Sequence, residues 1–176
     1  VDAVTATDWV KGNASSTVTL IEYSDFQCPA CAAYFPVIED FYSKNSTSFK
    51  FVYRHFPLTQ HANAIPASKA SEAAGKQGKF WEMHSKLFSN QDSWATSTDA
   101  KTVFEGYAKD LGLDIEKYNA DLELPEVATK IDNDQKSGIK AGVNSTPTFY
   151  LNGKKVSPQN YDQLKKLIDE ATSTNS

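Results

Sequence analysis

This chain has little cysteine, little methionine and no long apolar run. Its 176 residues include two cysteines and one methionine, and two cysteines are too few for the dense disulfide framework of a small secreted domain. No apolar stretch approaches the roughly 20 residues that a membrane-spanning helix needs. An excess of positive charge is also lacking, because 18 basic against 22 acidic residues leave a formal charge of -4. We therefore expect no nucleic-acid partner.

The residues that are present give the composition of a globular protein. Hydrophobic residues make up 40%, charged residues 23% and aromatic residues 12% of the chain, which excludes disordered, collagen-like and coiled-coil classes. The length lies within the usual range of one domain, so we expect residues 1–176 to form a single domain. The sequence shows no separate dimerisation domain, and we expect a monomer. The chain starts at Val1 without an initiator methionine, and we expect that a leader or membrane anchor preceded it.

The first third of the chain predicts a strand, a helix and a second strand. Residues 17–24 and residues 49–56 are short β-branched and apolar runs, which are typical of buried strands. Between them, apolar residues recur at helical spacing from Pro29 to about residue 42, and proline suits a first helical turn. Two strands joined through a helix in one sheet are parallel and cross over right-handedly. The fold class is therefore α/β.

The rest of the chain predicts a block of helices, a hairpin and a last helix. Helix-forming residues dominate between residues 60 and 140, and we expect four or five helices there, one of them capped by Thr98. Asn152-Gly153 lies between two short strand-like runs over residues 147–156, which indicates a hairpin. A helix is then expected from Ser157-Pro158 onward. This order suits a mixed central sheet with helices on both faces and a helical insertion.

Both cysteines, Cys28 and Cys31, lie in one Cys-Pro-Ala-Cys segment soon after the first predicted strand. Unpaired backbone N–H groups and the helix dipole stabilise an anion at a helix N-terminus, so we expect the pKa of the Cys28 thiol to lie below its usual value. Cys31 is one turn further into the helix, where we expect it to be more buried and less ionised. This pattern predicts dithiol redox chemistry in which Cys28 forms a mixed disulfide and Cys31 resolves it.

Three other interpretations of the cysteine pair remain open. A structural disulfide within this four-residue segment would stabilise the chain little, on the order of 2 kcal/mol. A zinc or copper site would need two more soft or imidazole ligands, and the three histidines, His55, His61 and His84, are scattered in the sequence. Two inert buried thiols fit poorly at an exposed junction between a strand and a helix. The placement favours redox chemistry.

Glu22 lies in the first predicted strand, six residues before Cys28. By the two-residue period of a strand it shares one face with Val18 and Leu20, and a central parallel strand is covered on both faces. We therefore expect Glu22 to be buried and its pKa to be raised. Such a carboxyl could carry the proton that Cys31 loses or gains during exchange. The alternative is a partly solvated carboxylate without a role in the chemistry.

Four segments together resemble the DsbA-like thiol–disulfide oxidoreductases, a family with a thioredoxin fold interrupted by a helical insertion. They are VTLIEYSDFQCPAC at 18–31, FVYRHFPL at 51–58, GKFWEMHSKLF at 78–88 and STPTFYLNG at 145–153. The resemblance covers nearly the whole chain. It implies a thioredoxin-like α/β fold whose thioredoxin parts are residues 1–58 and 141–176, with the helical insertion at residues 59–140.

The same resemblance implies a set of site residues. Thr146-Pro147 corresponds to the cis-proline loop, which in this family packs beside the cysteine pair and offers backbone groups to a substrate peptide. Glu22 occupies the position of an acidic residue beneath the disulfide. Pro29 and Ala30 are further expected substrate-binding residues, but the best-known member has Pro-His at this dipeptide. Because Ala30 offers neither a side-chain hydrogen bond nor a charge, the reduced form is expected to be less stabilised.

The resemblance implies a disulfide oxidase that donates its disulfide to reduced, folding proteins outside the cytoplasm of a bacterium, in the periplasm or at the outer face of the membrane. No metal or organic cofactor is expected, and a membrane quinone-linked oxidase would regenerate the disulfide. The alternatives are a reductase or isomerase of the same fold, and a metal-binding or peptide-binding module without turnover. Trp81, His84 and Phe88 also match family residues, but their helical spacing predicts a packing role.

Overall fold

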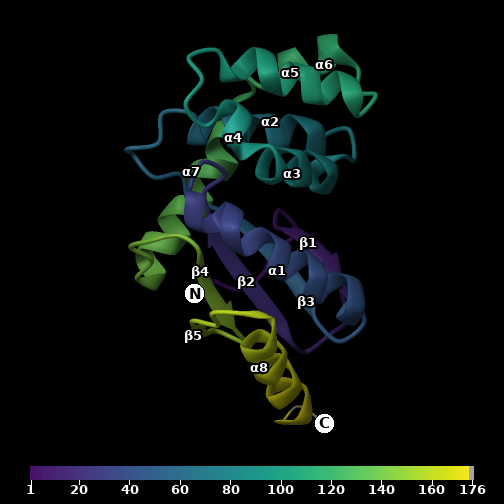
Figure 1. The fold of residues 1–176 in the computed structure, drawn as a ribbon, viewed down its shortest axis with the longest axis vertical. Helices are drawn as coiled ribbons and strands as arrows, with labels where there is room; N and C mark the ends of the chain where they lie inside the picture. The colour runs from purple at the N-terminus through teal and green to yellow at the C-terminus, as the bar shows by residue number, and fades with distance from the viewer. Residues whose placement is uncertain (175–176) are drawn as a thin grey trace.

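The computed structural model describes residues 1–174 and contains a five-stranded mixed sheet (Figure 1). The strands follow the order β1-β3-β2-β4-β5, with the bounds β1 Trp9–Gly12, β2 Thr19–Ser24, β3 Lys50–His55, β4 Thr148–Leu151 and β5 Lys154–Val156. β2 and β3 are parallel, as expected for two strands joined through a helix, and the other neighbours are antiparallel. The two predicted buried strands and the predicted α/β class are confirmed.

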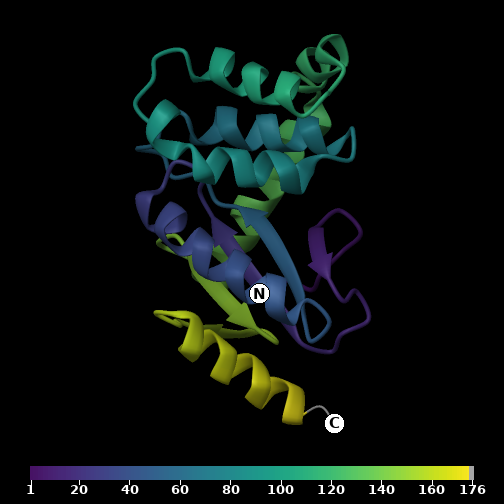
Figure 2. The same cartoon turned by 45° about the vertical axis from the view of Figure 1, so that its right-hand side comes forward.

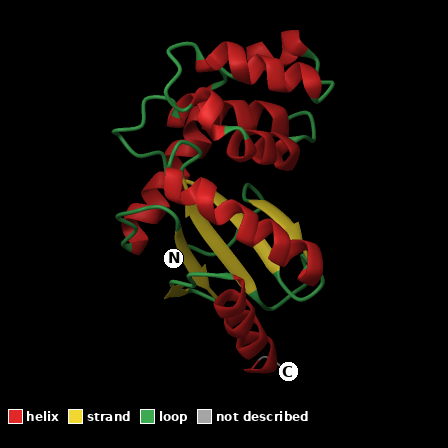
Figure 3. Ribbon diagram, viewed as in Figure 1, coloured by secondary structure: helices red, strands yellow, loops and turns green. Residues whose placement is uncertain are grey.

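Helices cover both faces of the sheet and stack beyond one of its ends (Figures 1 and 3). The helices of the described residues are α1 Pro29–Asn45, α2 Ala64–Gly75, α3 Phe80–Ser89, α4 Gln91–Trp94, α5 Ala100–Asp110, α6 Ile115–Asp121, α7 Pro125–Ala141 and α8 Tyr161–Thr174. α1 crosses one face of the sheet, and α8 contacts both α1 and β4. α2 to α6 form the stack, and α7 links it to the sheet because it contacts both α2 and β3 (Figure 2).

The alternation of β2 divides the core between the two faces of the sheet. Leu20 belongs to the large apolar cluster under α1 and α8, whereas Ile21 and Tyr23 belong to a smaller cluster on the opposite face. α7 covers this second face closely, because a Cβ atom at Gly138 would lie 2.6 Å from the Phe56 ring. Only glycine therefore allows α7 to approach the sheet at this point. The same alternation places Glu22 on the face of Leu20, as the sequence predicts.

The hairpin between β4 and β5 has the turn that its sequence demands. Asn152 and Gly153 both adopt positive φ, at 46° and 83°. Two successive central residues with positive φ define a type I′ turn, whose twist matches that of the flanking strands. The predicted hairpin is confirmed.

Two predictions about the number of elements are wrong. β1 was not expected, because four residues of an edge strand carry no clear two-residue period. The segment between β3 and β4 holds six helices in the described chain rather than four or five. One helix that was not predicted is α4. It has only four residues and is too short to show helical periodicity.

Two predicted helix starts are also displaced. The N-cap of α5 is Asp99 rather than Thr98, since the Ser97 hydroxyl accepts the Asp99 amide at 3.0 Å and holds the turn before the helix. α8 begins at Tyr161 rather than at Ser157-Pro158. The Asn160 side chain accepts the Gln163 amide at 3.0 Å, so an N-cap bond fixes the later start.

Candidate active site

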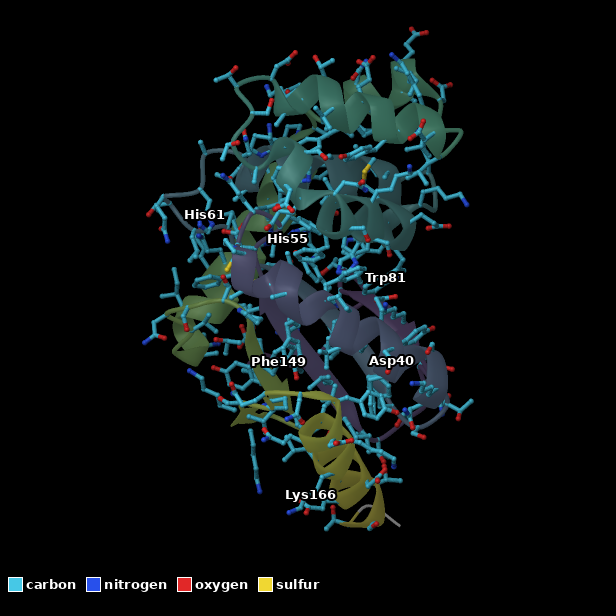
Figure 4. The ribbon with its side chains drawn as sticks, viewed as in Figure 1. Asp40, His55, His61, Trp81, Phe149 and Lys166 are labelled. Atoms are coloured by element: carbon cyan, nitrogen blue, oxygen red, sulfur yellow. The ribbon has the colours of Figure 1, made fainter. Side chains whose placement is uncertain are left out.

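The cysteine pair lies where β2 leads into α1, at the end of the sheet that faces the helical stack. Cys28 is the N-cap residue of α1, and Pro29 is its first helical residue. The Cys28 amide donates to the Asp25 carbonyl oxygen at 3.0 Å, and the Cys28 carbonyl oxygen accepts the Ala32 amide at 3.1 Å. Figure 4 shows His55 and His61 near this end. The predicted position of Cys28 at a helix N-terminus is confirmed.

The two sulfurs differ in depth. Both residues are free thiols, but Cys31 is 0% exposed while Cys28 is 7% exposed. The deeper position predicted for Cys31 is confirmed. The junction is less open than expected, because Thr146 packs against Cys28 on one side and Gln91 bonds its carbonyl group on another. The exposed part of the junction is Pro29-Ala30, between the cysteines.

The Cys28 sulfur is a stabilised thiolate site. Its pKa is lowered to about 5, chiefly by a hydrogen bond from the Cys31 thiol and further by the Thr146 side chain and the backbone amides of Cys31 and Ala30, which together outweigh burial. Burial raises the pKa of Cys31 well above its usual value, and the hydrogen bond to Cys28 adds to this. Cys28 is therefore ionised at neutral pH while Cys31 keeps its proton. Ala30 contributes through its backbone alone.

The loop before β4 packs directly on Cys28. The Thr146-Pro147 peptide bond is cis, which confirms the expectation from the family resemblance. The Cys28 thiol donates to the Thr146 carbonyl oxygen at 3.5 Å. The Thr146 hydroxyl is buried and has no hydrogen-bond partner among residues 1–174. When Cys28 is ionised its sulfur only accepts hydrogen bonds, and the Thr146 hydroxyl is then a neighbouring donor.

Glu22 is buried beneath α1, with 5% of its surface exposed. Burial raises its pKa to about 7, and the Ser24 hydroxyl and the charge of Lys11 oppose this only in part. The negative charge of Glu22 in turn contributes to the raised pKa of Cys31. The carboxyl and the buried thiol therefore share one electrostatic environment. The predicted burial and the predicted direction of the pKa are confirmed, and the role in proton transfer stays a prediction.

Known proteins share the family and the fold of this chain. The family model described as Thioredoxin matches residues 4–170 of this chain. The chain belongs to the thioredoxin family. Within the thioredoxin superfamily, its structural neighbours include DsbA-like thiol–disulfide oxidoreductases. The resemblance of the four sequence segments to this group and the predicted thioredoxin-like fold are thereby confirmed.

Three solved structures document the likeness. A thioredoxin-like oxidoreductase from Silicibacter pomeroyi DSS-3 is 28% identical, with a TM-score of 0.82 and coverage of 96% of this chain and 94% of that one. BdbD from Bacillus subtilis, in its oxidised form, is 26% identical, with a TM-score of 0.78 and coverage of 95% and 94%. alpha-DsbA1 from Wolbachia pipientis, at 22% identity, shares the fold with a TM-score of 0.83 and coverage of 97% and 94%.

Longer curated relatives contain a segment similar to this thioredoxin-family chain. Na(+)/H(+) antiporter NhaA 1 of Mycolicibacterium gilvum is 36% identical over 151 residues, which are 84% of this chain and 24% of that protein. Na(+)/H(+) antiporter NhaA 3 of Salinispora tropica is 35% identical over 166 residues, 93% of this chain and 24% of that protein. The chain spans about a quarter of the length of these relatives. Across residues 1–174, no helix has both the length and the apolar character to cross a membrane.

Sequence analysis missed the residue that holds the backbone before the reactive cysteine of this thioredoxin-family protein. Gln91, in α4, is buried, and its amide nitrogen donates to the carbonyl oxygens of Phe26 at 2.6 Å and Cys28 at 3.0 Å. It thereby ties the helical stack to the first turn of α1. No sequence signal marks a glutamine in a helix of four residues, because its partner groups belong to the backbone.

Asp25 is a second residue that the analysis missed. Its carboxylate accepts the Gln27 amide at 2.7 Å and the Leu58 amide at 2.9 Å, and it bonds His61 Nδ1 at 2.6 Å. It therefore joins the loop before Cys28 to the segment that follows β3. A signal was available here, since an aspartate directly after a strand commonly bonds the amide two residues on.

The histidines lie in three different surroundings. His55 bonds the Glu72 carboxylate at 2.8 Å and His61 bonds Asp25, whereas His84 is packed among aromatic rings, including those of Tyr53 and Phe88. The predicted packing role of His84 and Phe88 is confirmed by their burial. Within residues 1–174, no group of three or more His, Cys, Asp or Glu side chains is arranged to hold a metal ion.

Proposed function

We propose that this protein introduces disulfide bonds into reduced proteins by donating the disulfide of its oxidised Cys28–Cys31 pair. The observation that carries this proposal is the contrast between two neighbouring sulfurs. The pKa of Cys28 is lowered to about 5, whereas that of Cys31 is raised well above its usual value. A stable Cys28 thiolate favours the reduced form of the pair, and a dithiol whose reduced form is stabilised is a strong oxidant.

The reaction proceeds in two exchange steps. A substrate thiolate attacks Cys28 Sγ, the bond between Cys28 and Cys31 breaks, and a disulfide forms between Cys28 and the substrate. Cys31 leaves as a thiolate and takes up a proton, because its buried position disfavours the charge. The second substrate thiolate then attacks the substrate sulfur of the mixed disulfide, and Cys28 leaves as a stable thiolate. Two substrate thiols are oxidised, and the pair accepts two electrons.

Several expectations from the family resemblance belong to this proposal. Pro29, Ala30, Thr146 and Pro147 bind the substrate peptide beside Cys28, since the first two are exposed and the other two form the adjacent loop. The substrates are reduced, folding proteins outside the cytoplasm, and a membrane quinone-linked oxidase returns the pair to its disulfide form. The protein acts as a monomer without a cofactor. The chain functions as one domain, with residues 59–140 inserted between thioredoxin parts.

The direction of transfer is tested by the reduction potential of the pair. Wild-type protein is equilibrated in a graded series of reduced and oxidised glutathione, and the oxidised fraction is read by alkylation and mass spectrometry. We expect a potential well above the roughly -270 mV of thioredoxin. A value near or below that of thioredoxin would favour the alternative, a reductase or isomerase. If Cys28 and Cys31 do not interconvert between dithiol and disulfide at any glutathione ratio, the result would favour the other alternative, a binding module without turnover.

We propose that Glu22 supplies the proton that Cys31 takes up. Its pKa of about 7 lets the carboxyl both hold and release a proton near neutral pH. In Glu22→Gln, we expect the step near pH 7 in the rate of exchange to disappear. The measurement is the pH dependence of the single-turnover rate between pH 5 and 9. An unchanged pH profile would contradict the proton-transfer role.

The stability of the same variant separates burial from proton transfer. The folded-state pKa of Glu22 lies above its unfolded value, so stability from the protonated carboxyl is complete below the unfolded pKa and is lost as the pH rises through about 7. Between pH 4.5 and 8 the wild type should therefore lose about 3 kcal/mol relative to Glu22→Gln. Denaturant unfolding at both pH values measures this. A shift in stability with an unchanged rate profile would leave Glu22 buried but outside the chemistry.

A further inference from the structure

Tyr53 of β3 carries a buried hydroxyl that the reaction described above does not use. The residue is 0% exposed, and its hydroxyl has no hydrogen-bond partner among residues 1–174. The Ser24 hydroxyl lies close enough to lower the pKa of Tyr53 in part, yet it also lacks a hydrogen bond within these residues. A buried hydroxyl without a partner costs stability, and phenylalanine would fill the same site without this cost. Packing alone therefore does not explain the hydroxyl.

The register of the sheet places Tyr53 directly beside Glu22. The two residues are paired across the parallel strands β2 and β3, so their side chains leave the same face of the sheet from backbones about 4.8 Å apart. Cys31 belongs to the same buried cluster as Tyr53. Burial raises the pKa of Tyr53 well above its usual value, and the charges of Glu22 and Cys31 add to this. The hydroxyl therefore keeps its proton at neutral pH and lies within electrostatic reach of both groups.

The other titratable neighbours of Tyr53 already have partners or carry no charge. The Asp25 carboxylate also raises the pKa of Tyr53, but it accepts two backbone amides and bonds a histidine nitrogen. The His84 ring centre lies 4.9 Å from that of Tyr53, and burial lowers the pKa of His84 so far that the ring stays neutral. The His55 ring centre lies 5.3 Å away, and this histidine bonds a different carboxylate. Glu22 is therefore the neighbouring anion for the Tyr53 hydroxyl.

The surroundings of Glu22 contain two tyrosine hydroxyls, which differ in what they reach. The charged and titratable groups around Glu22 are Lys11 of β1, Cys28, Cys31, Tyr34 and Glu39 of α1, and Tyr53 of β3. The Tyr34 hydroxyl is also buried without a partner among residues 1–174, but its raised pKa has only burial and the charge of Glu22 as causes. Tyr53 responds to both Glu22 and Cys31, the two groups between which the proton moves.

We propose that Tyr53 is a positioning residue whose hydroxyl donates a hydrogen bond to the Glu22 carboxylate that remains when Cys31 takes up the proton. This inference rests on the proposed function. When the substrate thiolate breaks the Cys28–Cys31 bond, the electron pair passes to Cys31 Sγ, a proton passes from Glu22 to that sulfur, and the negative charge remains on the carboxyl group. A donor that gains its partner only when Glu22 ionises stabilises the charged state selectively. The proton returns to Glu22 when the pair is oxidised again.

Tyr53→Phe tests this role because it removes the hydroxyl and keeps the ring. The pH midpoint that Glu22 gives to the single-turnover rate should rise from the Glu22 pKa of about 7 to about 8, since a donor to the charged form is lost. Below the midpoint, the rate per peptide thiolate should fall about fivefold. Pre-oxidised protein is mixed with a dithiol peptide between pH 5 and 9, and the products are read by acid quench, alkylation and mass spectrometry. The alkylation midpoint of Cys28 near pH 5 should not move.

Tyr23→Phe is the matched control, because Tyr23 follows Glu22 in β2 and belongs to the cluster on the opposite face of the sheet. Tyr23 is also 0% exposed, but its hydroxyl bonds the Ser137 hydroxyl at 2.6 Å and accepts from Arg54 at 3.0 Å. Tyr23→Phe should therefore lower the melting temperature and keep the rate and its pH midpoint. Tyr53→Phe should keep or raise the melting temperature and slow the exchange. This contrast separates a hydroxyl that holds the fold from one that serves the reaction.

The Glu22→Gln background shows whether Tyr53 acts through the carboxyl group. In Glu22→Gln/Tyr53→Phe, the second substitution should change the rate by less than about twofold, because glutamine carries no charge for the hydroxyl to stabilise. A fivefold loss that persists in this background, an unchanged midpoint in Tyr53→Phe, or a shift of the midpoint in Tyr34→Phe instead would overturn the assignment to Tyr53. These results would leave the proposed function intact. Absence of exchange in the wild type would contradict the proposed function and this inference together.

Discussion

Replacement of Cys28 by serine should lower the rate of thiol–disulfide exchange by roughly three orders of magnitude or more, to the uncatalysed background. The variant loses the sulfur that the substrate attacks, and the remaining Cys31 is 0% exposed with a pKa well above its usual value. A buried thiol that keeps its proton does not act as a nucleophile at neutral pH. The measurement is single-turnover oxidation of a dithiol peptide by the pre-oxidised wild type and by each variant treated in the same way.

Cys31→Ser is the matched control, because it makes the same substitution three residues further on. This variant keeps the reactive Cys28 thiolate and lacks the resolving thiol. It should therefore accumulate a mixed disulfide with a disulfide-containing peptide, visible as an adduct by mass spectrometry, without completing a turnover. Adducts on Cys28→Ser, or full turnover by Cys31→Ser, would contradict the assigned roles.

The pH dependence of Cys28 provides a second readout of the same site. Its lowered pKa means that the thiolate, which is the reactive form, dominates above about pH 5. The alkylation rate of the reduced wild type should therefore rise with pH, reach half of its plateau near pH 5 and stay constant through neutral pH. A midpoint near that of a free thiol, about 8.5, would show that Cys31, Thr146 and the helix amides do not stabilise the thiolate.

The sequence predicts those parts of this site that depend on local order along the chain. Cys28 caps α1 because a buried strand, a short loop and Pro29 fix where the helix begins. Glu22 is buried because the two-residue period of β2 decides its face. The cis state of the Thr146-Pro147 bond followed from the family resemblance alone, since composition and periodicity carry no information about it.

The parts that were missed depend on contacts between distant segments. Gln91 reaches Cys28 across 63 positions of the chain, and only the packing of the helical stack on the sheet brings the two together. β1 gains its strand conformation by pairing with β3, and its four residues show no pattern when taken alone.

Arg54 is a second position where a large effect is expected, and it acts on stability rather than on chemistry. It is 3% exposed, and its guanidinium donates to both carboxylate oxygens of Asp8, at 2.8 and 2.9 Å. It also donates to the Asp2 and Ala3 carbonyl oxygens and to the Tyr23 hydroxyl, each at 3.0 Å. One side chain of β3 thereby fastens the N-terminal segment to the sheet.

The Asp8 carboxylate depends on this arginine. Burial alone would raise the pKa of Asp8, but the hydrogen bonds and charge of Arg54, together with the Thr5 amide, hold it below its usual value. Removal of one partner from a buried ion pair leaves an uncompensated charge and costs about 3–5 kcal/mol. Arg54→Met should therefore lower the free energy of unfolding by that amount, and the melting temperature by about 10 °C.

Two variants identify the origin of this loss. The double variant Arg54→Met/Asp8→Leu lacks the uncompensated Asp8 carboxylate. Its free energy of unfolding should therefore be higher than that of Arg54→Met. Lys136→Met removes an exposed ion pair with Asp132 of α7 and should change stability by less than about 0.5 kcal/mol. Denaturant unfolding measures the free energy of unfolding of the wild type and of these three variants. If Asp8→Leu does not restore any of the stability lost in Arg54→Met, the role of the Asp8 charge is contradicted. If it does, the lost free energy of unfolding is assigned to the buried charge rather than to the volume of the arginine side chain.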